Sequence, residues 1–385
     1  MIKFNAILLA FILSSLPSSS SAQSFQTKAK QAIVMDFESG SILYQKNADQ
    51  LMPPASMAKL MTIEVVFNAL KTGQLTFNST FSISEDVWKR GGANSGGSTM
   101  FAKLNSDIKL ENLIRGVIIQ SGNDAAMAIA EGMAGSENGF AGLMNQRAKR
   151  IGLSHSRFTN STGLPDPQQR VTARDLAVLA RHIIKTYPQL YKIYSEPEFT
   201  WNKVRQRNRN PLLGKVEGAD GMKTGYTEAS GYGLVGSAFR DGRRVIMVLN
   251  GMTSKRERSS EAVKMMRWAS RAFQAIKLFK AGEVVGEATL YGGAKSGVEL
   301  KADGALQIFV PVGFRDRLRA EIVFSGPLRA PISKGSQIAK LQVLVDGKVS
   351  QETPLFAVED VAVGSIPQRA MDAAQELIVG VFRFQ

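Results

Sequence analysis

One stretch of the sequence, Ser56 to Leu70, places apolar residues on every side of a predicted helix and constrains the fold most. A helix that is hydrophobic all round must be enclosed, because none of its faces can lie against water. Gly73 stands just beyond it, where a helix commonly stops. The chain therefore has to build a domain in which several elements pack around one central helix.

Ser56 and Lys59 stand one helical turn apart at the start of this stretch, so their side chains share a face. Burial of an ammonium group is costly, which predicts a lowered pKa for Lys59 and a neutral amine beside a hydroxyl. Such a pair is a base next to a nucleophile. A lysine whose charged end reaches solvent fits the same spacing, so this pair alone does not decide.

The pattern around this helix predicts both strands and helices. A hairpin is expected from Ala32 to Asp49, and two more strands, Gly231 to Phe239 and Arg243 to Leu249, are joined by Asp241-Gly242, a favoured tight turn. A last helix is expected from Ser259 to Phe279. The helices predicted between these strands are Leu110 to Ile119, Asp124 to Met133, Gly139 to Ile151 and Ala173 to Lys185.

After Ala281-Gly282 the sequence changes to short alternating runs separated by glycine and proline. The change predicts a first domain over residues 23–281 and a small all-β domain over residues 282–364. Residues 365–385 are expected to form an amphipathic helix. Because its charges cancel and it has no tryptophan, membrane-surface contact and packing on protein are equally favoured. The runs are Ala305 to Pro311, Arg319 to Phe324, Gln337 to Val345 and Val349 to Leu355.

Composition and the first residues indicate where the protein acts. The 385-residue chain has no cysteine and only two histidines, which excludes thiol catalysis and argues against a histidine-rich metal site. Residues 1–22 are typical of a secretory leader, with Lys3, an apolar run from Ala6 to Leu13 and the cleavage pattern Ser20-Ser21-Ala22. The apolar run is too short to span a membrane. The net charge of +15 favours an anionic partner, and export points to the cell envelope rather than to nucleic acid.

Two further motifs extend the Ser56 and Lys59 pair. Ser121-Gly122-Asn123 precedes a predicted helix, and Lys223-Thr224-Gly225 precedes a predicted strand. Ser-x-x-Lys, Ser-x-Asn and Lys-Thr-Gly in this order are typical of serine acyl-enzymes. Second copies of the three motifs occur at Ser106 to Lys109, Ser136-Glu137-Asn138 and Lys71-Thr72-Gly73. Order and context select the first set, since Ser106 to Lys109 lies in a polar stretch and Lys71-Thr72-Gly73 ends the apolar helix.

In these motifs the sequence resembles the low-molecular-mass penicillin-binding proteins that are D-alanyl-D-alanine carboxypeptidases. The resemblance covers nearly all of the chain beyond the leader, and implies an α+β fold. It implies a β-lactamase/transpeptidase-like catalytic domain, with an antiparallel sheet, helices on both sides and a helical subdomain, followed by the small all-β domain. The residues that carry it are 54–62, 121–125, 160–165, 221–227 and 327–332, with Lys334-Gly335.

The resemblance also implies a reaction: removal of the terminal D-alanine from the pentapeptides of peptidoglycan, a step in cell-wall biogenesis and cell shape. Ser56 would attack the carbonyl between two D-alanines and Lys59 would accept its proton. Ser121 and Lys223 would pass a proton to the departing D-alanine, and Lys223 would further lower the pKa of Lys59. Asn123 would hold the substrate amide.

Further residues are expected to bind the substrate, and no cofactor or metal ion is implied. Backbone N–H groups of Ser56 and Tyr226, the residue after Gly225, would form an oxyanion hole. Thr224 and Arg258 match family positions that receive the terminal carboxylate, although spacing does not separate Arg258 from Arg256. β-Lactams, which present a similar carbonyl and carboxylate, are expected to acylate the enzyme as covalent inhibitors.

The sequence is also compatible with two other functions. A β-lactamase needs a carboxylate for deacylation, and Glu64 to Asn68 resembles such an element. Glu64 precedes the second motif on the Ser56 helix, so a structural role is favoured, and Gly122 replaces the aspartate of class A enzymes. Alternatively, the β domain docks on peptidoglycan and catalysis is weak. The expected location is the periplasm, free or attached to the outer face of the inner membrane.

Overall fold

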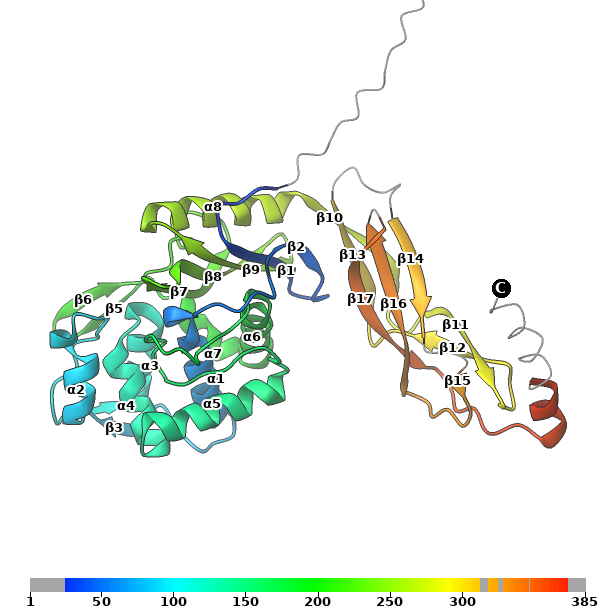
Figure 1. Ribbon diagram of the computed structural model, residues 1–385, viewed down its shortest axis with the longest axis horizontal. Coiled ribbons are helices and arrows are strands. Elements are labelled where there is room, and N and C mark those ends of the chain that lie inside the picture. Colours follow the sequence, from blue (N-terminus) through cyan, green and yellow to red (C-terminus); the bar gives the residue numbers. More distant parts are fainter. Residues whose placement is uncertain (1–24, 312–317, 325–327, 346, 373–385) are drawn as a thin grey trace, which may run out of the picture.

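The computed structural model describes residues 25–311, 318–324, 328–345 and 347–372. The predicted leader, residues 1–22, lies outside these residues, as does most of the predicted C-terminal helix. Figure 1 shows an α and β domain formed by the first part of the chain and a group of β strands formed by the last part.

A five-stranded antiparallel sheet forms the framework of the first domain, in the order β2-β1-β9-β8-β7. The three inner strands, β1, β9 and β8, are largely buried because helices cover both faces of the sheet. The predicted turn between β8 and β9 is confirmed: Asp241 and Gly242 both have positive φ. The strands are β1 (Gln31–Asp36), β2 (Ile42–Lys46), β7 (Ala219–Thr227), β8 (Gly231–Arg240) and β9 (Arg243–Met252).

Helices pack on this sheet and form a subdomain beside it (Figure 1). One helix, α8, covers one face, whereas α1 and α6 lie on the other. The helices are α1 (Lys59–Lys71), α2 (Glu85–Gly91), α3 (Leu110–Arg115), α4 (Asn123–Ala134), α5 (Glu137–Ile151), α6 (Ala173–Thr186), α7 (Pro188–Tyr191) and α8 (Lys255–Arg271). Four short strands form two antiparallel pairs. β3 (Thr80–Ser82) pairs with β4 (Asp107–Lys109), and β5 (Glu198–Trp201) pairs with β6 (Val204–Arg207).

The central helix is enclosed as its sequence requires. Ten of the thirteen residues of α1 are buried, so the prediction of a surrounded helix is confirmed. The helix begins later than predicted, at Lys59, because Ala55 has a positive φ of 47° and the chain first makes a tighter turn over Ala55–Ala58. Ser56 lies in this turn, half-buried, while Lys59 is fully buried.

The predicted helix from Ser259 to Phe279 is wrong in its second half. Helix α8 ends at Arg271, and residues 273–279 form β10 (Phe273–Phe279), which pairs with β13 (Leu306–Pro311). A short apolar run fits either a helix or a strand, and a partner strand 30 residues away in sequence is invisible to a local pattern.

The C-terminal strands form a sheet in the order β14-β16-β17-β12-β11-β15. The alternating runs predicted as strands are confirmed, whereas β11, β12 and the short β15 were not predicted. Residues 366–372 are helical, in keeping with the start of the predicted C-terminal helix. In the part of the chain that is described, no helix is long and apolar enough to cross a membrane. The remaining strands are β11 (Val284–Tyr291), β12 (Gly297–Lys301), β14 (Leu318–Val323), β15 (Leu328–Arg329), β16 (Gln337–Val345) and β17 (Lys348–Ala357).

Candidate active site

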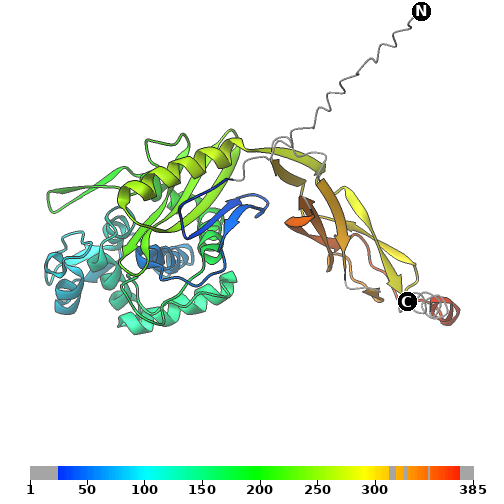
Figure 2. The same ribbon diagram turned by 45° about the horizontal axis from the view of Figure 1, so that its top comes forward.

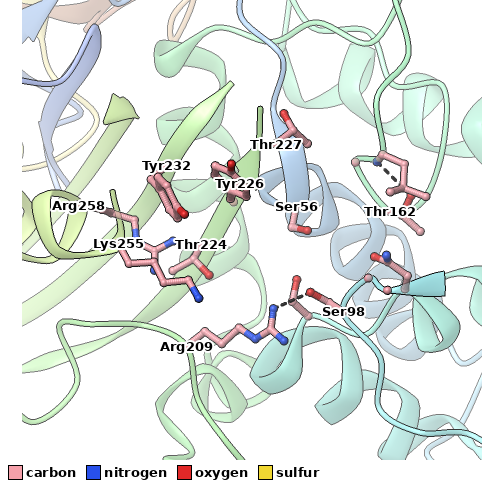
Figure 3. A pocket seen from close by; sticks show the side chains of 17 residues that line it. Ser56, Ser98, Thr162, Arg209, Thr224, Tyr226, Thr227, Tyr232, Lys255 and Arg258 are labelled. Atoms are coloured by element: carbon pink, nitrogen blue, oxygen red, sulfur yellow. Dashed lines mark hydrogen bonds between the residues drawn. The ribbon is translucent and has the colours of Figure 1, made fainter. Parts of the chain in front are cut away.

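The three predicted motifs meet at one cavity of about 680 Å³ (Figure 3). Ser56 comes from the turn before α1, Ser121 and Asn123 from the start of α4, and Lys223 from the edge strand β7. Lys59 and Lys223 are buried behind the wall of the cavity. The structure therefore brings together five side chains from three segments that are widely separated in sequence. The residues predicted to bind the substrate also line this cavity: Thr224, Gly225, Tyr226 and Arg258.

Lys59 has three polar neighbours. Its Nζ lies 2.7 Å from Asn123 Oδ1, 2.6 Å from the Thr162 carbonyl oxygen and 3.1 Å from Ser56 Oγ. The first two are oxygens that only accept hydrogen bonds, so they take the two N–H groups of a neutral amine. Ser56 is the one partner of the three that can also donate: its Oγ accepts from the protonated amine, and its hydroxyl can donate to the free electron pair of the neutral amine.

The pKa of Lys59 is lowered to about 7. Burial is the main cause, followed by the positive charge of Arg209, while the carboxylates of Asp124 and Glu137 act in the opposite direction. Lys223, which the resemblance implied would lower the pKa of Lys59, is not among these causes, and the leading charge is Arg209. A substantial fraction of Lys59 is consequently neutral at pH 7.

Lys223 and Ser121 form a second pair of amine and hydroxyl. Lys223 Nζ donates to Ser121 Oγ at 2.8 Å and to the Thr224 carbonyl oxygen at 3.1 Å. Burial lowers the pKa of Lys223 well below its usual value, and the charges of Lys59 and Arg209 add to this effect. Ser121 has a φ of 66°, an uncommon conformation for a residue with a side chain, which marks it as locally constrained.

Backbone contacts fix the position of the nucleophile turn. Gly163 has a φ of 82°, and a Cβ atom built there would lie 1.8 Å from the Ala55 carbonyl oxygen. Thr62, on α1, donates a hydrogen bond to the Ser161 carbonyl oxygen at 2.7 Å. The segment 160–163 therefore lies directly against Ala55, the residue before Ser56, at a distance that only glycine permits, and also contacts α1.

One end of the cavity is lined by cationic and aromatic side chains (Figure 3). The Arg258 guanidinium lies over the Tyr232 ring at 5.7 Å, and the ring of Tyr226 stacks on Tyr232 at 4.1 Å. Burial lowers the pKa of Arg258 to about 10. Arg256 does not line the cavity, so the structure separates the two arginines that spacing did not.

Sequence reasoning missed several residues of the cavity. Arg209 and Lys255 line it, and Arg209 donates a hydrogen bond to Ser98 Oγ at 2.5 Å. Asp124, beside the cavity, was also missed: its buried carboxylate accepts from Met100 N at 2.9 Å and from Ala102 N at 3.1 Å, which holds the loop over α4. The signal for Asp124 was its place in the first turn of a helix, directly after Asn123.

Glu64 lies outside the cavity. Its carboxylate binds the Arg147 guanidinium at 2.5 Å, the Tyr187 hydroxyl at 3.0 Å and the His182 ring at 3.2 Å. These contacts lower its pKa and account for its burial on α1. A carboxylate so occupied cannot position a water molecule at Ser56, so the arrangement gives no support to a β-lactamase reading based on Glu64. Among the described residues there is also no group of three or more acidic or histidine side chains that could hold a metal ion.

Comparison with known sequence families gives two matches. The family described as D-alanyl-D-alanine carboxypeptidase matches residues 18–254. The family described as penicillin-binding protein 5, C-terminal domain, matches residues 273–363. The two matches together account for most of the chain.

Individual proteins are similar over nearly the whole chain. D-alanyl-D-alanine carboxypeptidase DacC of Escherichia coli (strain K12) is 37% identical over 371 residues, 96% of this chain and 93% of that protein. The crystal structure of penicillin binding protein 5 from Haemophilus influenzae is 39% identical, with a TM-score of 0.76, over 88% of this chain and 98% of that one. Penicillin-Binding Protein D2 from Listeria monocytogenes, solved in an ampicillin-bound form, is 28% identical with a TM-score of 0.56, over 64% of this chain and 99% of that one.

Proposed function

This chain belongs to the family of D-alanyl-D-alanine carboxypeptidases among the low-molecular-mass penicillin-binding proteins, and we propose that Ser56 and Lys59 carry its reaction. It is a serine-type carboxypeptidase that acts on peptidoglycan. The observation that carries the proposal is the buried Lys59 amine, whose pKa is about 7 and whose Nζ lies 3.1 Å from Ser56 Oγ. A neutral amine at hydrogen-bond distance is a competent general base for a serine nucleophile.

Acylation follows from this pair. Ser56 Oγ bonds to the carbonyl carbon of the penultimate D-alanine, and its proton passes to Lys59 Nζ. The backbone N–H groups of Ser56 and Tyr226 stabilise the oxyanion that forms. Asn123 Oδ1 already accepts from Lys59, so its amide nitrogen remains to bind a substrate carbonyl.

Departure of D-alanine requires a proton on its nitrogen. When the bond between the carbonyl carbon and that nitrogen breaks, Ser121 Oγ gives its proton to the nitrogen and Lys223 Nζ replaces it. The carboxylate of the bound substrate raises the pKa of Lys223 again, because a nearby negative charge favours the ammonium form. Water then hydrolyses the ester on Ser56: its oxygen bonds to the carbonyl carbon as the bond to Ser56 Oγ breaks, and one of its protons returns to Ser56 Oγ. The proton held by Lys59 replaces the one that Lys223 gave up.

Thr224 and Arg258 receive the terminal carboxylate. The planar guanidinium of Arg258 can donate two parallel hydrogen bonds to it, and no residue of the described structure pairs with its Nε atom. A β-lactam presents a carbonyl and a carboxylate to the same two groups and acylates Ser56. The ampicillin-bound form of the similar Listeria protein supports this part of the proposal.

Because peptidoglycan lies outside the cytoplasmic membrane, the site of action is the periplasm. The leader predicted over residues 1–22 supports export, and attachment of the C-terminal helix to the outer face of the inner membrane remains part of this proposal. Removing Ser365 to Gln385 should lower partition into liposomes if the helix binds lipid.

The direct test is release of D-alanine from a peptide that ends in D-Ala-D-Ala, measured beside penicillin hydrolysis and covalent penicillin labelling. Ser56→Ala should abolish both D-alanine release and labelling. Ser106→Ala is a matched control, because Ser106 belongs to the second Ser-x-x-Lys motif, and its hydroxyl donates to the Lys103 carbonyl oxygen away from the cavity. Labelling that survives in Ser56→Ala would contradict the proposal, and rapid penicillin turnover without D-alanine release would indicate a β-lactamase.

A further inference from the structure

A basic hairpin comes just before Arg209, which lines the catalytic cavity, and none of the steps above uses it. Strands β5 and β6 form this hairpin. Glu198 lies opposite Arg207 at its open end, and Trp201 lies opposite Val204 next to the turn. Figures 1 and 2 show this hairpin projecting from the catalytic domain on the side remote from the C-terminal strands. Such a projection has little of its surface covered by the protein itself.

The exposed side chains of the hairpin and its neighbouring loop are mainly cationic. We call Lys103, Lys203, Arg205 and Arg207 the basic lip; all four are exposed. Arg205 is paired with Glu198, whereas Lys203 and Arg207 form no ion pair with any residue of the described structure. Arg207 also acts on Glu198 through its charge, but one carboxylate against four cations leaves the basic lip positive, and positive charge on a projecting element attracts anions.

The hairpin is fixed to the loop that covers α4. Asn202 Nδ2 donates to the Phe101 carbonyl oxygen at 2.6 Å, and Gln206 Nε2 donates to the Met100 carbonyl oxygen at 3.1 Å. Phe101 is 38% exposed, which leaves an apolar contact surface beside the cations. The basic lip is therefore a joint surface of a hairpin and a loop.

Backbone contacts and the segment after β6 link this joint surface to the active site. The loop is held by the Asp124 carboxylate, and the backbone N–H of Asn123 donates to the Ser98 carbonyl oxygen at 2.7 Å. Arg209 follows β6 by two residues and lines the cavity. A polymer whose end occupies the cavity and that extends past Arg209 would meet the basic lip.

We propose that the basic lip binds carboxylates of stem peptides adjacent to the one being cleaved, and so makes the enzyme prefer polymeric peptidoglycan over a free peptide. The proposal rests on the proposed function and specifies its substrate class. Every uncleaved stem peptide ends in a carboxylate, so the polymer presents a series of anions. A free peptide presents its terminal carboxylate to Thr224 and Arg258 and leaves the lip empty.

The test compares two double variants of the full chain. Lys203→Gln/Arg207→Gln removes the two unpaired charges of the hairpin. Lys149→Gln/Arg150→Gln is the control, because these two exposed cations lie in the last turn of α5 and line no part of the cavity. The measured quantities are kcat/KM for D-alanine release from peptidoglycan strands and from a free peptide ending in D-Ala-D-Ala.

The lip variant should lose at least about threefold in kcat/KM on the strands and keep its value on the free peptide. The control variant should retain both values. For the unchanged protein, activity on strands should fall between about 0.01 M and about 1 M salt, and this dependence should be weaker in the lip variant. Penicillin labelling should be equal in all three proteins.

Three results would overturn the proposal. One is an unchanged value on strands, and another is an equal loss on both substrates, which would mean that the charges act on the cavity. The third is loss of sedimentation with anionic lipid vesicles while strand hydrolysis is retained, since that would assign the lip to a membrane surface. Failure of the unchanged protein to release D-alanine from the free peptide would instead contradict the proposed function.

Discussion

At the scale of single residues, the protonation of Lys59 links the structure to the rate. Its pKa is lowered to about 7, so the amine is protonated below pH 7 and neutral above it. Only the neutral form can accept the Ser56 proton, so the rate of penicillin acylation should rise through pH 7 and level off above it. Neither histidine lines the cavity, so a transition near pH 7 has no imidazole explanation there. A flat profile between pH 5.5 and 9 would contradict a neutral-amine base.

The carboxylate site gives a second prediction at this scale. Arg258→Lys keeps the positive charge but loses the planar guanidinium and its contact with Tyr232. We expect kcat/KM for the peptide to fall by about tenfold or more, the loss typical of one charged hydrogen bond. Arg256→Lys, two residues away and outside the cavity, should leave kcat/KM unchanged, and an equal loss in both variants would reassign the effect to α8.

At the scale of elements, the site depends on how closely the segment 160–163 approaches the turn before α1. Gly163→Ala adds a methyl group that would lie 1.8 Å from the Ala55 carbonyl oxygen, so the turn that carries Ser56 must move. Penicillin acylation should fall by about 100-fold, because small displacements of a nucleophile have large kinetic effects.

Gly135→Ala is the matched control for this substitution. Gly135 has a similar positive φ of 71°, but no atom lies within 4 Å of the added methyl group. This variant should lose only about 1 kcal/mol of stability in thermal unfolding and keep its acylation rate. Equal acylation rates in the two alanine variants would show that the close approach does not matter.

At the scale of the whole molecule, the apolar cores are separate. The two core clusters around the catalytic sheet are built from residues between Ala29 and Ala269, whereas the core of the C-terminal strands is built from residues between Ala288 and Val361. A chain that ends after Ala272 therefore keeps both catalytic cores and removes β10 together with its partner β13.

This truncated chain should fold cooperatively and hydrolyse a free peptide within about twofold of the full chain, which also tests a docking role of the β domain. Loss of penicillin labelling in a folded truncated chain would contradict this independence.

The sequence by itself determined the enclosed helix, most helices and strands, and the three motifs, because these depend on local periodicity, turn chemistry and order along the chain. It did not determine that residues 273–279 are a strand, since that depends on pairing with β13. It did not identify Arg209 as the charge beside Lys59, and it named Arg258 by family resemblance although spacing alone did not separate Arg258 from Arg256. These are matters of distance between segments far apart in sequence, and only the packed tertiary structure decides such distances, together with the burial that lowers the pKa of Lys59.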